Sequence, residues 1–182
     1  MMTGFEWKRP LRLYRFWAEQ RGAAAVEFAL VLSLLAIPIL NVVDFSLYAW
    51  DRMQVDNAAQ GAAQAAWATC DVYTKLPATT NCSSLNTATT TAAQSTVLGN
   101  AITVTSRTEN YYCIKAGVLY TQGTFPGNKP SDCGSWGGSS SDQPGDYIKI
   151  AVSYTYSPLF PGVSIVGYLP TPVVRTAWMR LG

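Results

Sequence analysis

The sequence contains no histidine, and this absence removes several classes of chemistry. Without an imidazole there can be no Ser-His-Asp or Cys-His catalytic arrangement, and the commonest protein ligand for transition metals is missing. The four cysteines include no Cys-x-x-Cys pair, which argues against a structural zinc site. We therefore expect neither a metal ion nor a cofactor in this protein.

Acidic residues are also few, and their distribution does not suggest catalysis. The carboxylates after residue 68 are scattered along the chain, at Asp71, Glu109, Asp132, Asp142 and Asp146. Most of them fall in expected loops, which makes a hydrolase with paired carboxylates a poor fit. The sequence also lacks a glycine motif placed between a strand and a helix, as phosphate binding would require. We expect a protein that is not an enzyme.

Charge of either sign is scarce, because only 13% of the 182 residues are charged, against about 25% in an average soluble protein. Residues 1–22 hold five basic and two acidic side chains, a net charge of +3, whereas the rest of the chain holds eight basic and nine acidic, a net charge of −1. Beyond the first segment there is thus no excess positive charge, and nucleic-acid binding has no electrostatic basis.

The most prominent feature present is a long apolar run. Its 21 residues, Ala23 to Val43, include one charged side chain, that of Glu27. A helix of this length extends about 31 Å, roughly the thickness of a bilayer core. The basic residues just before the run predict that residues 1–22 stay in the cytoplasm and that the chain after Val43 is translocated. A carboxylate in such a helix is costly, so Glu27 is a candidate functional residue.

A basic leader, Gly22, four small or apolar residues, Glu27 and a long apolar run together resemble type IV prepilins. The whole chain is most similar to the TadE-like minor pilins (pseudopilins) of the tight-adherence (Tad/Flp) pilus. The resemblance implies that a prepilin peptidase cuts between Gly22 and Ala23. The new α-amine of Ala23 would then pair with Glu27 of the same or a neighbouring chain and fix the axial register between subunits.

The resemblance covers Arg21 to Ala68 and Asp146 to Leu181 and implies a structural role in assembling a tight-adherence pilus for surface attachment and biofilm formation. Its implied partners are the prepilin peptidase, other pilins or pseudopilins and inner-membrane assembly proteins, in a homo- or hetero-oligomeric filament. The implied location is the bacterial inner membrane, crossed once, with a periplasmic C-terminal domain that reaches the surface pilus after assembly. One alternative stays open: an uncleaved single-pass anchor whose outer domain is a sensor or adhesin. The resemblance also does not separate a TadE-like from a TadF-like role.

The helical pattern continues beyond the apolar run as far as Ala68. Asp44 and Phe45 form the acidic-aromatic pair with which the family's helix typically continues. We expect Tyr48 and Trp50 to anchor the helix at the outer membrane interface. The side chains expected on one helical face are Leu47, Trp50, Gln54, Ala58, Ala62 and Ala65. Small residues on such a face would let another element approach closely.

The remaining residues predict a small disulfide-stabilised domain. Cys70, Cys82, Cys113 and Cys133 all lie on the translocated side, where disulfides form. Three pairings are possible, and we favour Cys70 with Cys82 and Cys113 with Cys133.

The predicted fold class is α+β, with a long N-terminal transmembrane helix that extends into a small antiparallel sheet domain, as in pilins. The expected regions are a leader (1–22), a transmembrane helix (23–43), its extracytoplasmic continuation (44–68) and the α+β domain (69–182). Within that domain the pattern predicts loops at 70–82 and 121–146, a helix at 90–98 and strands at 102–105, 111–120, 148–157 and 173–180.

Overall fold

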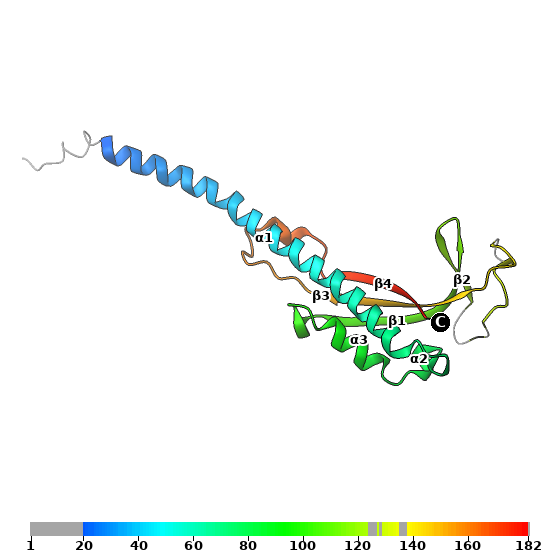
Figure 1. Ribbon diagram of the computed structural model, residues 1–182. Coiled ribbons are helices and arrows are strands. Elements are labelled where there is room, and N and C mark those ends of the chain that lie inside the picture. The colour runs from blue at the N-terminus through cyan, green and yellow to red at the C-terminus, as the bar shows by residue number, and fades with distance from the viewer. Residues whose placement is uncertain (1–19, 124–126, 128, 135–137, 182) are drawn as a thin grey trace, which may run out of the picture.

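The computed structural model describes residues 20–123, 127, 129–134 and 138–181, so the predicted leader falls almost wholly outside the described residues. A single long helix, α1 (Gln20–Cys70), carries a small domain, the head, along its C-terminal half (Figure 1). In the head, α1 packs on a four-stranded antiparallel sheet. This architecture confirms the predicted α+β class. The helix continues through Pro38 without interruption.

The buried face of α1 is built largely of alanine. Val55, Ala59, Ala62, Ala66 and Cys70 are buried and recur three, four or seven residues apart, as one helical face requires. Small side chains on that face allow the sheet and helix α3 (Leu85–Ala93) to lie close against the backbone. The head is therefore held on the helix by close packing against this face, most of whose side chains are small.

The predicted face of α1 is only partly correct. Ala58 and Ala62 are buried as expected, but Leu47 and Trp50 are exposed. Tyr48, predicted as an interfacial anchor, is instead buried within the head. The face of α1 that packs against the head is rotated relative to the predicted face, because Tyr48 and Val55, rather than Leu47 and Trp50, are buried in the core.

The sheet has the strand order β2-β1-β3-β4. Its strands are β1 (Thr103–Lys115), β2 (Val118–Gly123), β3 (Gly145–Tyr154) and β4 (Val173–Leu181). Ile148, Ile150 and Val152 of β3 are fully buried in the core, as their alternation predicts. The prediction for β4 is also correct. The strand predicted at 148–157 lies three residues earlier in the chain, because β3 begins at Gly145 and ends at Tyr154.

The predicted strand at 111–120 is wrong, because the chain reverses within it. Ala116 and Gly117 form the turn between β1 and β2, with φ of 50° and 79°. Glycine accepts such positive φ without strain, which is typical of a two-residue hairpin turn. The strand expected at 102–105 falls in the first part of β1. The polar residues in the middle of β1 made this one long strand look like two separate strands in the sequence.

The short helices also differ from prediction. Helix α3 (Leu85–Ala93) begins earlier than the expected 90–98, because Leu85, Thr89 and Ala93 share the face that is buried. The expected loop at 70–82 contains η2 (Tyr73–Lys75) and α2 (Ala78–Asn81). Among the described residues, further 3₁₀ turns include η3 (Gly99–Ala101) and η5 (Ile165–Tyr168).

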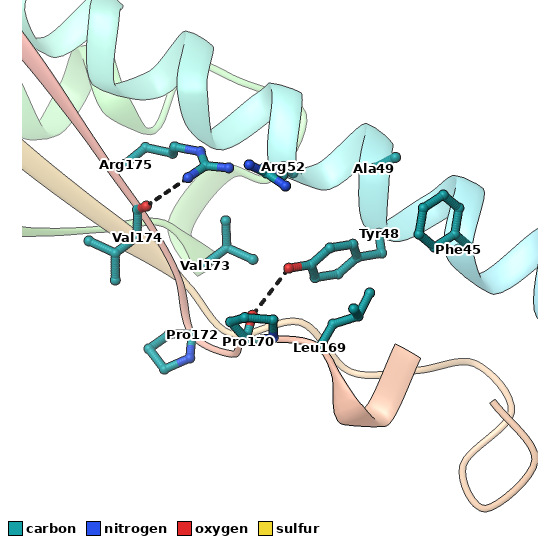
Figure 2. A pocket seen from close by; sticks show the side chains of 10 residues that line it. All are labelled: Phe45, Tyr48, Ala49, Arg52, Leu169, Pro170, Pro172, Val173, Val174 and Arg175. Atoms are coloured by element: carbon teal, nitrogen blue, oxygen red, sulfur yellow. Dashed lines mark hydrogen bonds between the residues drawn. The ribbon is translucent and has the colours of Figure 1, made fainter. Parts of the chain in front are cut away.

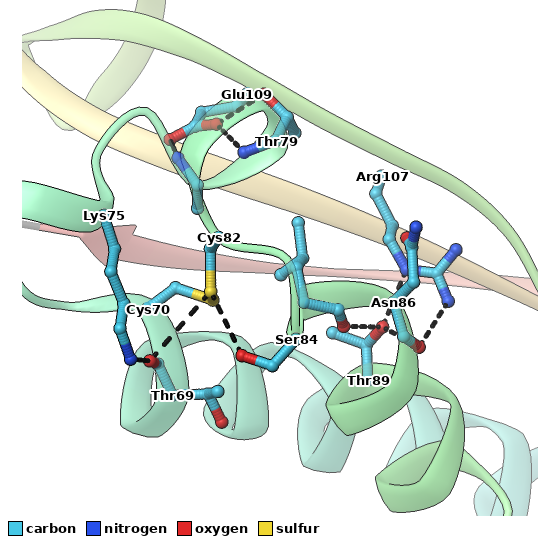
Figure 3. The surroundings of a disulfide bond; sticks show 12 residues. Thr69, Cys70, Lys75, Thr79, Cys82, Ser84, Asn86, Thr89, Arg107 and Glu109 are labelled. Atoms are coloured by element: carbon cyan, nitrogen blue, oxygen red, sulfur yellow. Dashed lines mark hydrogen bonds between the residues drawn. A yellow bond between two sulfur atoms is a disulfide. The ribbon is translucent and has the colours of Figure 1, made fainter.

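The structure has two disulfide bonds, as predicted, and joins Cys70 to Cys82 and Cys113 to Cys133. The first ties the end of α1 to α2, and the second ties β1 to the connection that precedes β3. Figure 3 shows two further sets of hydrogen bonds, both formed by side chains of β1. Arg107 donates to the Thr89 hydroxyl of α3 (2.7 Å), and Glu109 accepts from the Ala78 and Thr79 N–H groups at the start of α2 (2.7 Å each).

Candidate functional site

Three side chains of α1 stand in line where the apolar run ends. Asn41, Asp44 and Tyr48 are spaced three and four residues apart, so they share one helical face over about 10 Å of axis. All three bind the segment between β3 and β4, which is far away in sequence. We call these three residues and Tyr156 the boundary cluster.

Asp44 is the centre of the boundary cluster and is completely buried. Its Oδ1 accepts a hydrogen bond from the Leu159 N–H (2.9 Å) and lies 3.0 Å from the Tyr156 hydroxyl. Burial raises the pKa of Asp44, but the hydrogen bonds that it accepts, first from Ser164, then from Leu159 and Tyr156, outweigh burial and leave its pKa below the usual value. The carboxylate is therefore a fixed, charged acceptor at the edge of the apolar run.

Tyr156 is the complementary donor. Its ring is buried edge-on against that of Tyr48, with centroids 5.4 Å apart. Burial, together with the hydrogen bond to Asp44 and the charge of Asp44, raises the pKa of Tyr156 to about 12. The hydroxyl thus remains protonated and keeps donating at any physiological pH.

Asn41 and Tyr48, which lie before and after Asp44 on α1, bind the same segment between β3 and β4. The Asn41 side chain accepts from the Ile165 N–H (2.8 Å) and donates to the Val163 carbonyl (3.2 Å). The Tyr48 hydroxyl donates to the Pro170 carbonyl (3.2 Å). The head is consequently bound to α1 not only along the alanine face but also at the level where the apolar run ends.

The sequence-based prediction missed this cluster as a site. Asp44 was expected only as half of an acidic-aromatic pair, and Asn41 falls within the predicted transmembrane segment with no role assigned. The available signal was their spacing with Tyr48, which places two polar side chains and one amphipathic side chain on one face at the end of an apolar run. What they bind could not be predicted, since their partners lie more than 110 residues away in sequence.

The predicted processing residues lie at the other end of α1. Gly22, Ala23 and Glu27 are exposed and helical. Among the described residues, no hydrogen bond or ion pair is formed by the Glu27 carboxylate, so the structure leaves it accessible to a partner outside this chain. The Gly22–Ala23 bond lies inside the first turns of α1, whereas a peptidase substrate is expected to be extended. Cleavage there requires local unwinding, which a glycine makes easier.

Two carboxylates meet at the end of the head farthest from the apolar run. Glu109 and Asp146 are diagonal neighbours on β1 and β3, so the expectation that the carboxylates are scattered is wrong for this pair. Asp146 is 5% exposed, and its Oδ1 has no hydrogen-bond partner within the described part of the chain. Burial, and then the charge of Glu109, raises the pKa of Asp146 to about 7.

This pair borders a pocket of about 450 Å³ whose wall includes Tyr73, Lys129 and Asp146. Glu109 is not available for chemistry, because both of its oxygens accept hydrogen bonds from the start of α2. No three Cys, Asp or Glu side chains of the described residues come together as they would to hold a metal ion. The pair is best explained as part of the packing of this end of the head.

One helix of the described chain, α1, is long and apolar enough to cross a membrane by length and composition. Large side chains along its apolar run are exposed, among them Val26, Phe28 and Leu34. The head covers none of these three. An apolar surface of this extent requires either lipid or other helices around it.

Residues 22–64 match the family model described as TadE-like protein. The match begins at Gly22, includes Glu27, Asn41, Asp44 and Tyr48, and ends within the alanine-rich part of α1. No curated protein and no solved structure matches the chain.

Proposed function

We propose that the protein is a minor pilin or pseudopilin that helps to assemble the Tad pilus, because residues 22–64 match the family model described as TadE-like protein. The observation that carries the proposal is the apolar half of α1, which projects from the head with its side chains uncovered. Such a helix can lie in a bilayer before assembly and among the helices of other subunits afterwards. The role is structural rather than catalytic.

The disulfides support a head that folds outside the cytoplasm. Disulfide bonds persist in oxidising compartments such as the bacterial periplasm, and both bonds of this protein lie beyond residue 69. The basic residues before Ala23 favour a cytoplasmic location for that end of the chain. We therefore place the protein in the inner membrane, crossed once, with a periplasmic head, and propose the prepilin peptidase, other pilins and inner-membrane assembly proteins as its partners.

Processing is the first experiment. With the cognate assembly proteins present, wild type should yield a mature chain that starts at Ala23. Gly22→Glu should block the cut, because a large charged side chain no longer fits where a small residue is needed. Gly22→Ala is the matched control and should still be cut. The intact mass of membrane-extracted protein decides, and a wild-type chain that keeps its leader would favour the uncleaved anchor instead.

Assembly is the second experiment. Glu27→Ala should leave the head and its disulfides unchanged, because Glu27 is more than 40 residues from Cys70 along α1 and contacts none of the head. It should lose co-purification with the other pilus components, since the new amine of Ala23 would be left unpaired among apolar helices. Glu27→Asp keeps a carboxylate and serves as the control. Normal assembly of processed Glu27→Ala would show that this charge has no role.

A further inference from the structure

The connection between β3 and β4 carries a second exposed apolar surface. Residues 157–172, which we call the foot, contain no charged side chain in sixteen positions. Several large side chains of the foot face outward, namely Leu159, Val163, Ile165 and Tyr168. The most exposed of them is Tyr168, at 92%. A loop that faces water normally carries charge, so this surface indicates a partner that is itself apolar.

The position of the foot identifies that partner. Asn41 binds the backbone of Val163 and Ile165, and Asn41 lies only two residues before the end of the apolar run at Val43. The foot is therefore at the level where α1 leaves the bilayer core, and Figure 1 shows it as the orange segment beside α1. The hydrogen bond from Leu159 to Asp44 prevents the foot from moving away from this level.

Two arginines lie just beyond the foot. Arg52 and Arg175 line a groove of about 440 Å³ between α1 and the start of β4, together with apolar side chains such as Phe45 and Leu169. Figure 2 shows the ends of both arginine side chains directed toward one another. Asp56 forms an ion pair with Arg175 (Oδ1 to Nε, 3.0 Å), whereas Arg52 is exposed and forms no ion pair with any residue that the structure describes.

The height of Arg52 fits the phosphate layer of a membrane. It follows Val43 by nine residues, about 13 Å along the axis, and side chains of a helix lean toward its N-terminal end. A headgroup layer adds about 5–7 Å on each side of the bilayer core. A long arginine side chain that leans toward the bilayer covers the remaining distance, as snorkelling arginines do.

We propose that the foot is a second membrane contact: its apolar side chains enter the leaflet from which α1 emerges, and Arg52 binds the phosphates of anionic phospholipids there. The proposal rests on the proposed membrane span of α1. It combines the two features that hold peripheral segments on membranes, a buried apolar surface and a positive charge at the headgroups. The alternative occupant is the head of a neighbouring subunit.

The test uses the full chain in lipid nanodiscs of phosphatidylcholine and phosphatidylglycerol. A trifluoromethyl-phenylalanine is placed in separate samples at Tyr168, at Tyr73 and at Phe28. Tyr73 is the matched control, because it is 90% exposed but lies at the far end of the head. Fluorine relaxation is measured with dissolved oxygen, which concentrates in lipid, and with a nickel chelate, which stays in water. At Tyr168 the oxygen effect should be severalfold larger, and the nickel effect severalfold smaller, than at Tyr73.

Each outcome has a distinct meaning. A lipid-like response at Phe28 together with equal responses at Tyr168 and Tyr73 would overturn the proposal that the foot contacts lipid. A water-like response at Phe28 would instead show that α1 does not span the membrane. The proposed lipid contact of the foot, which rests on that span, would then be wrong as well. If the protection of Tyr168 disappears when the protein is diluted at constant lipid, a neighbouring chain covers the foot, and the lipid proposal is overturned.

The role of Arg52 is tested by varying the lipid charge. Replacing a third of the phosphatidylcholine by phosphatidylglycerol should increase the protection of Tyr168 in wild type. Arg52→Gln should abolish this increase, whereas Lys115→Gln, which removes the same charge from the end of β1, should retain it. An equal increase in all three proteins would refute phosphate binding by Arg52.

Discussion

Replacing Asp146 by asparagine should remove a pH-dependent loss of stability from the head. Burial and the nearby charge of Glu109 raise the pKa of Asp146 from 3.8 to about 7. The folded state thus holds this proton more tightly than the unfolded state does. Stability should be highest at low pH with respect to this group, fall as the pH rises from about 4 to 7, and stay level above that range.

The size of the effect follows from the shift. Each pKa unit corresponds to about 1.4 kcal/mol, so raising the pKa of Asp146 from 3.8 to about 7 gives a loss of up to about 4 kcal/mol between pH 4 and pH 8. Asparagine has the shape of the protonated acid but cannot ionise. Asp146→Asn should therefore exceed the unfolding free energy of wild type by no more than about 1 kcal/mol at pH 4.5 and by up to about 4 kcal/mol at pH 8.

The assay is urea unfolding of the full chain in detergent micelles at pH 4.5 and pH 8, followed by near-ultraviolet circular dichroism. Asp142→Asn removes an exposed carboxylate from the loop just before β3 and should change neither value by more than about 0.5 kcal/mol. An Asp146→Asn protein whose unfolding free energy changes with pH as much as that of wild type would refute the reasoning. Burial would then not be holding Asp146 protonated.

Three further predictions concern the packing of the head. Reduction of both disulfides should lower its unfolding free energy by about 2–5 kcal/mol, measured with and without reductant, and four freely alkylated thiols in periplasmic protein would contradict the bonds. Tyr156→Phe removes a donor from buried Asp44 and should cost about 1–3 kcal/mol in urea unfolding, whereas Tyr120→Phe at an exposed position should cost almost nothing. Gly145→Ala places a Cβ 2.6 Å from the Tyr147 ring and should cost about 1–3 kcal/mol; an unchanged thermal midpoint would show that the ring moves aside freely.

The elements that the sequence predicted well are those whose residue pattern directly reflects burial. The alternation in β3 and β4 and the apolar and alanine-rich lengths of α1 each correspond to a buried or a projecting surface. The middle of β1 is different, because Arg107 and Glu109 are used to bind α3 and α2. Charged residues at alternate positions do not distinguish a water-facing strand from one that binds helix ends.

The candidate functional residues also differ in whether they could be selected from the sequence. Gly22 and Glu27 could be selected from sequence because a charge and a glycine stand out against an apolar run. The boundary cluster could not, since Asp44 acquires its role only when Tyr156, 112 residues later, is brought to it. A polar residue near the end of an apolar helix is most simply interpreted as the start of the water-facing part. Only the fold shows that it is buried.

The boundary cluster also determines how the molecule can move. A continuous helix with a head bound only through Val55 to Cys70 could bend freely between the apolar run and the head. Here Asn41, Asp44 and Tyr48 extend the attachment to the end of the apolar run, so a bend at that level would expose a buried carboxylate without its donors. Helix and head therefore move as one body along the helix axis. If the protein is a pilin drawn out of the membrane, as we propose, the foot would leave the lipid in the same step as α1, and both would contribute to the work of extraction.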